Sequence, residues 1–484
     1  MSDSIIQGLV FTIVTAMIGF LTYWKCRGAN RRQSNQNREY FLAGGSLGWV
    51  FVAGSITLTN LSTDQLVGMN GNQMALLAWW ELAAVIGLVI LAKVFLPVYY
   101  RYNCTTTTEL LEKRYNNIHI RAVIGGLFLL GNAFIYMPAV IYSGSLFMQT
   151  MFNVDIPLMY IAVAFASIGA MYAFFGGLRA VAVSDTYSGV LLFAMAILVV
   201  FLSLQAINFD FSDIPAERLT MIGDNDSPLP WHTLLTGMIF IQVYYWGTNQ
   251  TITQRAMAAP TVKEAQKGVL VAAGIRLLIV PSIVVLPGII SYKLYGDIGD
   301  AAYGRIVGDV LPTWLTGVFA AAMAAAVLST YNSLLNSATA LYVCDIHETY
   351  IKKNPNVVHL SGWVTLLLSA LTLTLVPIYQ QAESIINLLQ QLNGLLSMPI
   401  LSIFIVGLLF KNVDARSGIG AVIFGVLMYA SLTFEFSPLH SSWHYIHLMP
   451  ITLVACISFS LLTNRFIFKN TASFNRKLSS SLAP

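Results

Sequence analysis

Long apolar segments alternate with short polar ones along the whole chain. Runs of about 20 mostly apolar residues recur throughout, and each is long enough to cross a hydrocarbon core about 30 Å thick. The pattern predicts about thirteen membrane-spanning helices, and therefore an all-α, polytopic membrane protein. The expected spans are 5–24, 45–70, 74–100, 120–150, 156–175, 181–207, 231–254, 268–292, 312–344, 357–378, 384–410, 417–435 and 446–464.

Composition supports this class and excludes others. The chain has 484 residues, of which 56% are hydrophobic and 10% are charged, against roughly 25% charged in an average soluble domain. The polar segments between the spans are too short for a soluble catalytic, nucleotide-binding or sensor domain. We therefore expect no enzyme activity, no nucleic-acid partner and no obligate protein partner. The first span lacks a basic start and a small-residue cleavage site, so we interpret it as a retained helix.

The basic residues predict the orientation. Of the 26 Lys and Arg residues, 21 fall in alternate loops, while the loop 208–230 on the opposite side is acidic. Loops on the cytoplasmic side of a membrane collect Lys and Arg. We therefore expect the N-terminus outside, the C-terminus in the cytoplasm, and a location in the cell membrane, specifically a bacterial inner membrane.

The stretch "ITLTNLSTDQLVGMNG", residues 56–71, is polar where lipid is expected. Broken backbone at membrane depth is tolerated only where it lines a cavity or packs against protein. Ser, Thr and Asn side chains compete with helical hydrogen bonds. We expect an interrupted helix here that turns carbonyls such as those of Leu58 and Leu61 toward a cation. The alternative is that the small polar residues only join helices together.

A second polar stretch, "AAAVLSTYNSLLNSATA", covers residues 324–340. Ser329 and Thr330 follow Ala326 by three and four residues, so in a helix both hydroxyls lie over its carbonyl. Such hydroxyls usually bond back to that carbonyl, but the three oxygens can instead converge on one hard cation. Together with two carbonyls of the first stretch they would form a site without a carboxylate, which suits a monovalent ion.

A third stretch, from Ile241 to Gly268, combines amides and aromatic rings, beginning with "IQVYYWGTNQ". Amide side chains bond hydroxyls both as donors and as acceptors, and aromatic faces stack on the apolar side of a sugar ring. An interfacial aromatic belt is the alternative, but Gln242 lies too deep for it. The stretch therefore favours a site for a polyol.

Three charged residues lie at membrane depth, where each costs at least roughly 2.5–3.5 kcal/mol. Glu81 and Asp185 are functional candidates, although water at the cytoplasmic edge can solvate Asp185. Arg276 either belongs to the site or neutralises Glu81 as a structural pair. In the outer loop, "HSSWHYIH" places His440, His444 and His447 at helical spacing without a fourth ligand, so we expect no metal there.

Several motifs taken in order resemble the solute:sodium symporter family and, within it, its sugar-transporting members. They are "YFLAGGSLGW", "TNLSTDQLVGM", "YYWGTNQTITQR", "EAQKG", "VVLPGI" and "AAAVLSTYNSLLNSATA". The resemblance implies a LeuT-like five-plus-five inverted repeat whose first and sixth core helices are discontinuous. It divides the chain into an extra helix with a basic loop (1–44), a transport core (45–411, with repeats 45–207 and 231–410) and two C-terminal helices with a short tail (412–484).

The resemblance also implies site residues. The sodium site corresponds to the carbonyls of Leu58, Leu61 and Ala326 and the hydroxyls of Ser329 and Thr330. The sugar site corresponds to Gln65, Glu81, Gln242 and Gln390, with Tyr245 closing its inner side and Arg276 nearest to a family lysine. A second sodium or coupling site would involve Asp185 and Ser333, beside Asn332. Gln242 and Ala84 stand where sugar-transporting members have Asn and Ser.

The sequence thus predicts a secondary active transporter that moves a neutral sugar, a hexose such as galactose or glucose, into the cell with co-transported sodium. The alternatives are another small solute, such as an organic acid, amino acid or nucleoside, and proton coupling through Asp185 or Glu81. An intramembrane enzyme or a sensor is disfavoured because the chain shows no catalytic dyad, metal motif or output domain.

Overall fold

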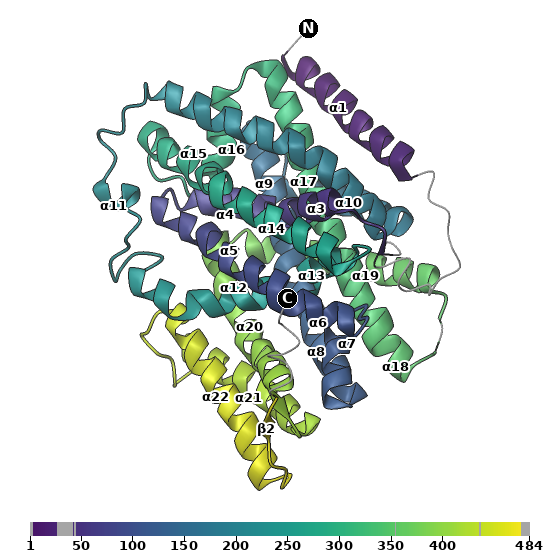
Figure 1. The fold of residues 1–484 in the computed structure, drawn as a ribbon. Helices are drawn as coiled ribbons and strands as arrows, with labels where there is room; N and C mark the ends of the chain where they lie inside the picture. The colour runs from purple at the N-terminus through teal and green to yellow at the C-terminus, as the bar shows by residue number, and fades with distance from the viewer. Residues whose placement is uncertain (1–2, 27–41, 43–44, 354, 435–436, 476–484) are drawn as a thin grey trace.

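The computed structural model describes residues 3–26, 42, 45–353, 355–434 and 437–475, and shows an all-α protein (Figure 1). The main helices are α1 (Asp3–Cys26), α3 (Trp49–Asn60), α4 (Thr63–Gly71), α5 (Trp79–Ile90), α6 (Leu96–Arg101), α7 (Thr107–Tyr115), α8 (Ile118–Gly131), α9 (Met137–Met151), α10 (Leu158–Ala206), α12 (Gly237–Gly247), α13 (Gln250–Met257), α14 (Val262–Leu278), α15 (Val280–Tyr295), α16 (Ala302–Val310), α17 (Thr313–Ala340), α19 (Val357–Tyr379), α20 (Ile385–Leu409), α21 (Ala415–Thr433) and α22 (Tyr445–Phe466).

Short elements connect these helices. They are η2 (Ala75–Ala78), η3 (Leu91–Phe95), η4 (Asn132–Tyr136), α11 (Ala216–Leu219), η5 (Trp231–Leu235), η6 (Gly299–Ala301), η7 (Leu341–His347) and α18 (Glu348–Tyr350). Among the described residues, the two strands β1 (Phe410–Lys411) and β2 (Ser473–Phe474) form one antiparallel pair. The predicted all-α class is confirmed.

The described part of the chain contains nine helical segments long and apolar enough to cross a membrane, and two shorter apolar ones, Ile6–Thr22 and Leu158–Tyr172. Neighbouring helices join into single spans, as α8, η4 and α9 do over Ile118–Met151. The apolar segments Leu158–Tyr172 and Thr186–Ala206 correspond to the expected spans 156–175 and 181–207, but α10 runs through both as one continuous helix of 49 residues. Such a helix is about 74 Å long, more than twice the thickness of a hydrocarbon core.

The expected helix break is confirmed in the first polar stretch. Helix α3 ends at Asn60 and α4 begins at Thr63, while Ser62 between them is extended, with φ −101° and ψ 177°. The Ser62 N–H donates to the carbonyl of Asn60, two residues back instead of four. The last carbonyls of a helix lack intrahelical partners, so the break turns backbone oxygens toward the protein interior.

A second break divides the third polar stretch. Helix α12 ends at Gly247 and α13 begins at Gln250. Asn249 starts the new helix, since its Oδ1 accepts a hydrogen bond of 2.9 Å from the Thr251 N–H, the side-chain cap that Asn commonly provides. Both breaks lie in the polar stretches that the sequence singles out.

Helix α17 runs through the centre of the bundle, and 22 of its 28 residues are buried. It packs against α1, α10, α9 and α3 (Figure 1). Its Ala-rich first half permits this close packing, since the side chains of residues 320–324 are all small or flexible and buried. Ser329 and Thr330 therefore lie inside the protein and not at the lipid surface.

The start of α20 is held by a loop residue. Asp300, in η6, accepts a hydrogen bond of 3.0 Å at Oδ2 from the N–H of Ile385, the first residue of α20. A carboxylate at a helix N-terminus is favourable because of the unpaired N–H groups and the helix dipole. Burial raises the pKa of Asp300 to about 7. Asp300 also contacts Gly71, the last residue of α4, so one carboxyl group joins α4 to α20.

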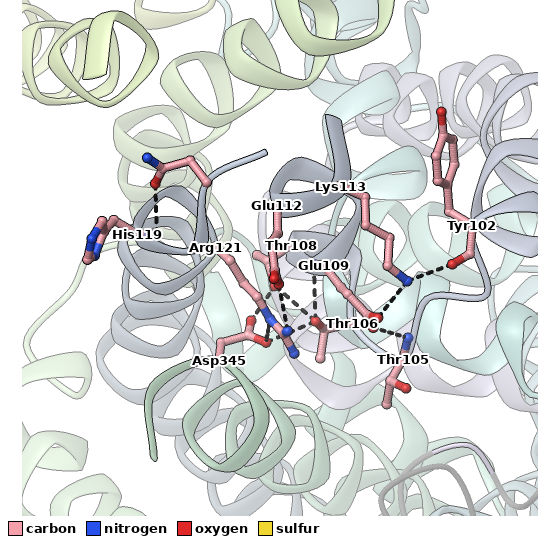
Figure 2. A network of polar contacts seen from close by, with 11 residues as sticks. Tyr102, Thr105, Thr106, Thr108, Glu109, Glu112, Lys113, His119, Arg121 and Asp345 are labelled. Atoms are coloured by element: carbon pink, nitrogen blue, oxygen red, sulfur yellow. Dashed lines mark hydrogen bonds and ion pairs between the residues drawn. The ribbon is translucent and has the colours of Figure 1, made fainter. Parts of the chain in front are cut away.

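A largely buried ionic network is centred on Asp345 and Arg121 (Figure 2). Asp345 in η7 is fully buried, and its Oδ1 lies 2.7 Å from Nε of Arg121 in α8. Arg121 also pairs with Glu112 of α7 at 2.8 Å. The hydroxyls of Thr106 and Thr108 donate to Asp345, the first at 3.0 Å. The network thus joins the neighbouring helices α7 and α8 to η7, which lies more than 200 positions later in the sequence.

We predict that Asp345→Asn destabilises the protein by about 2–4 kcal/mol, because it removes the fully buried carboxylate of the two that pair with Arg121 and leaves this guanidinium only the partly exposed Glu112. Denaturant or thermal unfolding in detergent measures the effect. The control is Asp309→Asn, whose carboxylate pairs with Arg305 at a site where both side chains are more than 40% exposed, and where a loss below about 1 kcal/mol is expected. Equal losses in the two variants would contradict the prediction.

Candidate functional site

A polar cavity lies where the two broken helices meet α5, α14 and α20. All six predicted substrate residues line it, namely Gln65, Glu81, Gln242, Tyr245, Arg276 and Gln390. Measured as the space open to the centre of a water molecule, its volume is about 80 Å³. That is room for about six waters, since one needs roughly 10–15 Å³ by this measure. The cavity is therefore of small-molecule size.

An ion pair forms one wall of this cavity. Glu81 of α5 and Arg276 of α14 are both fully buried, and Nη1 of Arg276 contacts Oε2 of Glu81. Nη2 of Arg276 donates to Oδ1 of Asn60, and the guanidinium lies 4.6 Å from the ring centre of Trp246. A buried charge is tolerated when it is paired and hydrogen-bonded. The expected pairing of Arg276 with Glu81 is thus observed, and the guanidinium is already occupied.

Two glutamines complete this wall. Gln65 donates through Nε2 to Glu81, whereas its Oε1 is buried without a hydrogen-bond partner among the described residues. Gln242 donates to the Trp80 carbonyl at 3.2 Å and accepts from Nε1 of Trp246 at 2.9 Å. Buried polar atoms are nearly always paired, so the unpaired oxygen of Gln65 marks a position for a ligand donor such as a hydroxyl.

Tyr245 and Asn60 separate the cavity from a smaller one. Nδ2 of Asn60 donates to the Tyr245 hydroxyl at 2.8 Å. Both residues, with Asp64 and Tyr136, line the larger cavity on one side and a cavity of about 30 Å³ on the other. Thr330 lines the smaller cavity. The larger cavity and the cavity beside Thr330 are therefore adjacent and share one wall.

Among the lining residues that were not predicted as site residues, four carry an amide, carboxyl or phenol group: Asn60, Asp64, Tyr136 and Asn393. Asn60 and Asp64 belong to the polar stretch that was singled out, and Asn393 follows Gln390 by one helical turn. Those three had a usable signal in their polarity or spacing. Tyr136 had none, because an aromatic residue in an apolar span is unremarkable by itself.

Tyr136 reaches the cavity because the backbone before it is a π-helix. η4 interrupts the α-helical ladder between α8 and α9, and such π-bulges are frequent at functional sites. The Tyr379 hydroxyl donates to the carbonyls of Phe134 at 2.7 Å and Ile135 at 3.0 Å. The Tyr136 hydroxyl in turn donates to Oδ1 of Asn393 at 2.6 Å. The irregular turn is thus stabilised from α19 and fixes a ring beside the cavity.

The predicted sodium residues lie on α3, at its break and on α17. Leu61 and Ala326 are fully buried, and Ser329 and Thr330 are nearly so. The Thr330 hydroxyl donates to the carbonyl of Thr59 at 3.2 Å, which ties α17 to the last turn of α3. The backbone of Leu58 belongs to that same turn. The geometry places hydroxyls of α17 next to the broken helix, as a shared cation site requires.

The residues of the second predicted cation site are only partly described. The side chain of Asp185 lies outside the described residues. Ser333 is buried, with its hydroxyl 3.4 Å from that of Thr59. Both polar atoms of the neighbouring Asn332 amide lack a hydrogen-bond partner among the described residues. This site stays a prediction.

Three comparisons place the chain among known proteins. The pattern of the sodium:solute symporter family matches residues 40–425. The chain is 32% identical to the uncharacterized symporter YidK of Escherichia coli (strain K12), over 94% of this chain and 82% of that protein. It is 31% identical to the sodium/glucose cotransporter of Vibrio parahaemolyticus, over 90% of this chain and 86% of that one.

A more distant relative and a solved structure are also similar to the chain. The chain is 28% identical to the human sodium/myo-inositol cotransporter 2, over 81% of this chain and 64% of that protein. Its fold is similar to that of a sodium-coupled sialic acid symporter in a substrate-bound outward-open state. There the TM-score is 0.79, with 17% identity, over 95% of this chain and 97% of that one.

Close packing of α5 on α12 positions Glu81 opposite Gln242, and it depends on Gly87. A Cβ atom added at Gly87 would lie 2.4 Å from the Gln242 carbonyl oxygen and 2.5 Å from the Trp246 ring. We predict that Gly87→Ala separates the two helices and lowers solute affinity at least tenfold. The control is Gly126→Ala in α8, where a Cβ meets nothing within 4 Å. Solute-dependent thermal stabilisation compares the two variants, and retention of affinity in Gly87→Ala would contradict the prediction.

Proposed function

Because the chain belongs to the sodium:solute symporter family, we propose that it carries a neutral monosaccharide, a hexose such as galactose or glucose, into the cell together with sodium. As a member of that family it is a sodium-coupled secondary transporter that crosses the membrane several times, and not an enzyme. The identity of the solute, the residues that bind it and the direction of transport are the proposed part.

The observation that carries the proposal is the chemistry of the larger cavity. Its polar groups include a neutralised Glu81–Arg276 pair, several amides and the Asp64 carboxyl, with the rings of Trp80, Tyr245 and Trp246 beside them. Carboxylate and amide oxygens accept hydrogen bonds from hydroxyls, and amide N–H groups donate to them. A ring compound with several hydroxyls satisfies both kinds of group. The sodium/glucose and sodium/myo-inositol cotransporters, which are relatives, are named for polyols.

The same geometry disfavours anionic solutes. A carboxylate or phosphate would need a free cation, and the guanidinium of Arg276 is held by Glu81 and Asn60. Asp64 adds a further acidic side chain to the lining. An organic acid would therefore meet net repulsion. Amino acids and nucleosides remain the alternative solutes, to be separated from sugars by competition.

We propose that sodium binds between the broken helix and α17. Its ligands would be the carbonyls of Leu58, Leu61 and Ala326 and the hydroxyls of Ser329 and Thr330. Sodium would then hold α3 against α17 in one conformation, and such differential binding is what coupling requires. The wall formed by Asn60 and Tyr245 lies between this site and the solute cavity, so the arrangement of one site affects the other.

The energetics suit a scavenging transporter. One charge moving down 100 mV yields about 2.3 kcal/mol, and a tenfold sodium gradient adds about 1.4 kcal/mol. With one sodium per solute, full coupling supports roughly 500-fold accumulation. A second sodium at Asp185 and Ser333 would raise this limit. We further propose that the N-terminus is outside and the C-terminus cytoplasmic, in the cell membrane of a bacterium.

Uptake into proteoliposomes tests the proposed function. An inward sodium gradient is compared with an equal potassium gradient at fixed voltage, using labelled galactose and competition by other hexoses, amino acids and nucleosides. We expect sodium-driven accumulation that glucose or another hexose competes away. Competition by an amino acid or nucleoside alone would overturn the sugar assignment, and equal uptake in both gradients would overturn sodium coupling for this solute.

The sodium site generates a separate prediction. Ser329→Ala and Thr330→Ala should each raise the half-saturating sodium concentration at least fivefold and leave sugar affinity at saturating sodium within about twofold. The control is Thr452→Ala in α22, a buried hydroxyl that bonds back to the carbonyl of Leu448 at 2.8 Å. Equal loss of sodium and sugar affinity at all sodium concentrations would contradict the proposed ligand set.

A further inference from the structure

A chain of hydrogen bonds joins two histidines where α12 begins. Nε2 of His232 lies 3.0 Å from Oδ1 of Asn225, and Nδ1 of His232 lies 2.6 Å from Nε2 of His447. Nδ1 of His447 lies 2.9 Å from the Thr236 hydroxyl. The two imidazole rings are nearly parallel, with their centres 4.6 Å apart. Loop, η5, α12 and α22 thus meet in one polar cluster.

The partners fix where the protons lie. Oδ1 of Asn225 can only accept, so Nε2 of His232 carries a proton and, in the neutral ring, Nδ1 does not. Nδ1 therefore accepts from the Nε2–H of His447, whose Nδ1 accepts from the Thr236 hydroxyl. Every donor and acceptor in this chain of hydrogen bonds has a partner while both rings are neutral.

The cluster tolerates one added proton but not two. A proton on Nδ1 of His447 is possible because the Thr236 hydroxyl can turn toward the Thr233 carbonyl, 3.2 Å away, and accept in its place. A second proton would have to go to Nδ1 of His232. It would then face the Nε2–H of His447, so two donors and two positive charges would oppose each other.

Within the described part of the chain, no ion pair offsets a second positive charge on this cluster. Asp224 and Asp226 flank Asn225, but no carboxylate of the described residues forms an ion pair with either ring. His444 is close by. Burial lowers its pKa to about 4, against a hydrogen bond with the Pro228 backbone that raises it, and His447 and His232 add smaller lowering effects. The phenol of Tyr445, the next residue, is neutral at acidic and neutral pH. The described residues contain no group of three metal-ligating side chains.

The cluster lies at the start of α12, a helix whose side chains line the proposed solute cavity. Thr236 immediately precedes α12, and a Cβ added at Gly237 would lie 1.9 Å from the carbonyl oxygen of Ile446 in α22. The first turn of α12 therefore rests directly on the first turn of α22. Gln242 and Tyr245 lie further along α12, so fixing its start constrains the cavity wall and the helix break after Gly247.

We propose that His232 and His447 form a proton-sensitive clasp that fixes the start of α12 to α22 and opens when both rings become charged. In the orientation proposed above the clasp faces outward, so an acidic exterior releases α12 from its anchor and shifts the conformational equilibrium of the transporter. The clasp does not depend on which solute the cavity binds.

Hydrogen–deuterium exchange of the full-length protein in detergent or nanodiscs tests this. Protection factors of segments 225–240 and 441–450, normalised to unstructured peptides at each pH, are measured from pH 8 to about pH 4.5. We expect constant protection down to about pH 6 and at least a tenfold loss by about pH 5, because the second proton must enter beside a ring that is already charged. Residues 118–131 of α8 report whether the whole protein unfolds instead.

Two variants make the test specific. In the double variant His232→Gln/His447→Gln each amide can donate and accept without titrating, so protection should not change over this pH range. His440→Gln, an exposed histidine of the same face, should behave like the unmodified protein. Unchanged protection in the unmodified protein down to pH 4.5, or an equal acid response in the double variant, would overturn the proposal. Neither result would bear on sodium-driven uptake, which is measured separately.

Discussion

The structure depends on one constraint: polar groups at membrane depth must find their partners within the protein. The Glu81–Arg276 pair shows how this is met, because each charge neutralises the other. Gln65 also donates to Glu81, and Arg276 also contacts Asn60 and the Trp246 ring. Removing either charge would leave the other in a medium that cannot solvate it. The pair therefore both stabilises the meeting of α5 and α14 and defines the chemistry of the cavity.

The two broken helices follow from the same constraint. A helix can end at membrane depth only if its free carbonyls and N–H groups lie against polar protein groups. At the first break the Thr330 hydroxyl donates to the Thr59 carbonyl, and at the second Asn249 caps the new helix. The breaks are consequently found where the solute cavity and the smaller cavity meet. We regard this shared wall as the physical basis of the proposed coupling between sodium and solute.

Two clusters of polar side chains far from the cavity join helices to one another. The Arg121–Asp345 network joins helices at one end of the bundle and is fully paired, which suits a rigid scaffold. The proposed clasp of His232 and His447 is paired only for particular protonation states, which suits an anchor that can open. Both bring together residues more than 200 positions apart in the sequence, and neither pairing was foreseen from the spacing of residues.

The sequence by itself determined the class of the protein, the approximate positions of its spans and the polar stretches where helices break. These features are local, because hydropathy over about 20 residues and the helix-breaking tendency of Ser, Thr and Asn act along the chain. It also marked Glu81 and Arg276, since an intramembrane charge is costly wherever it lies. Only the tertiary structure decided which residues face one another. Tyr136 reaches the cavity through a π-helix stabilised from α19, and His232 meets His447 across two segments, because such contacts depend on helix packing and not on spacing along the chain.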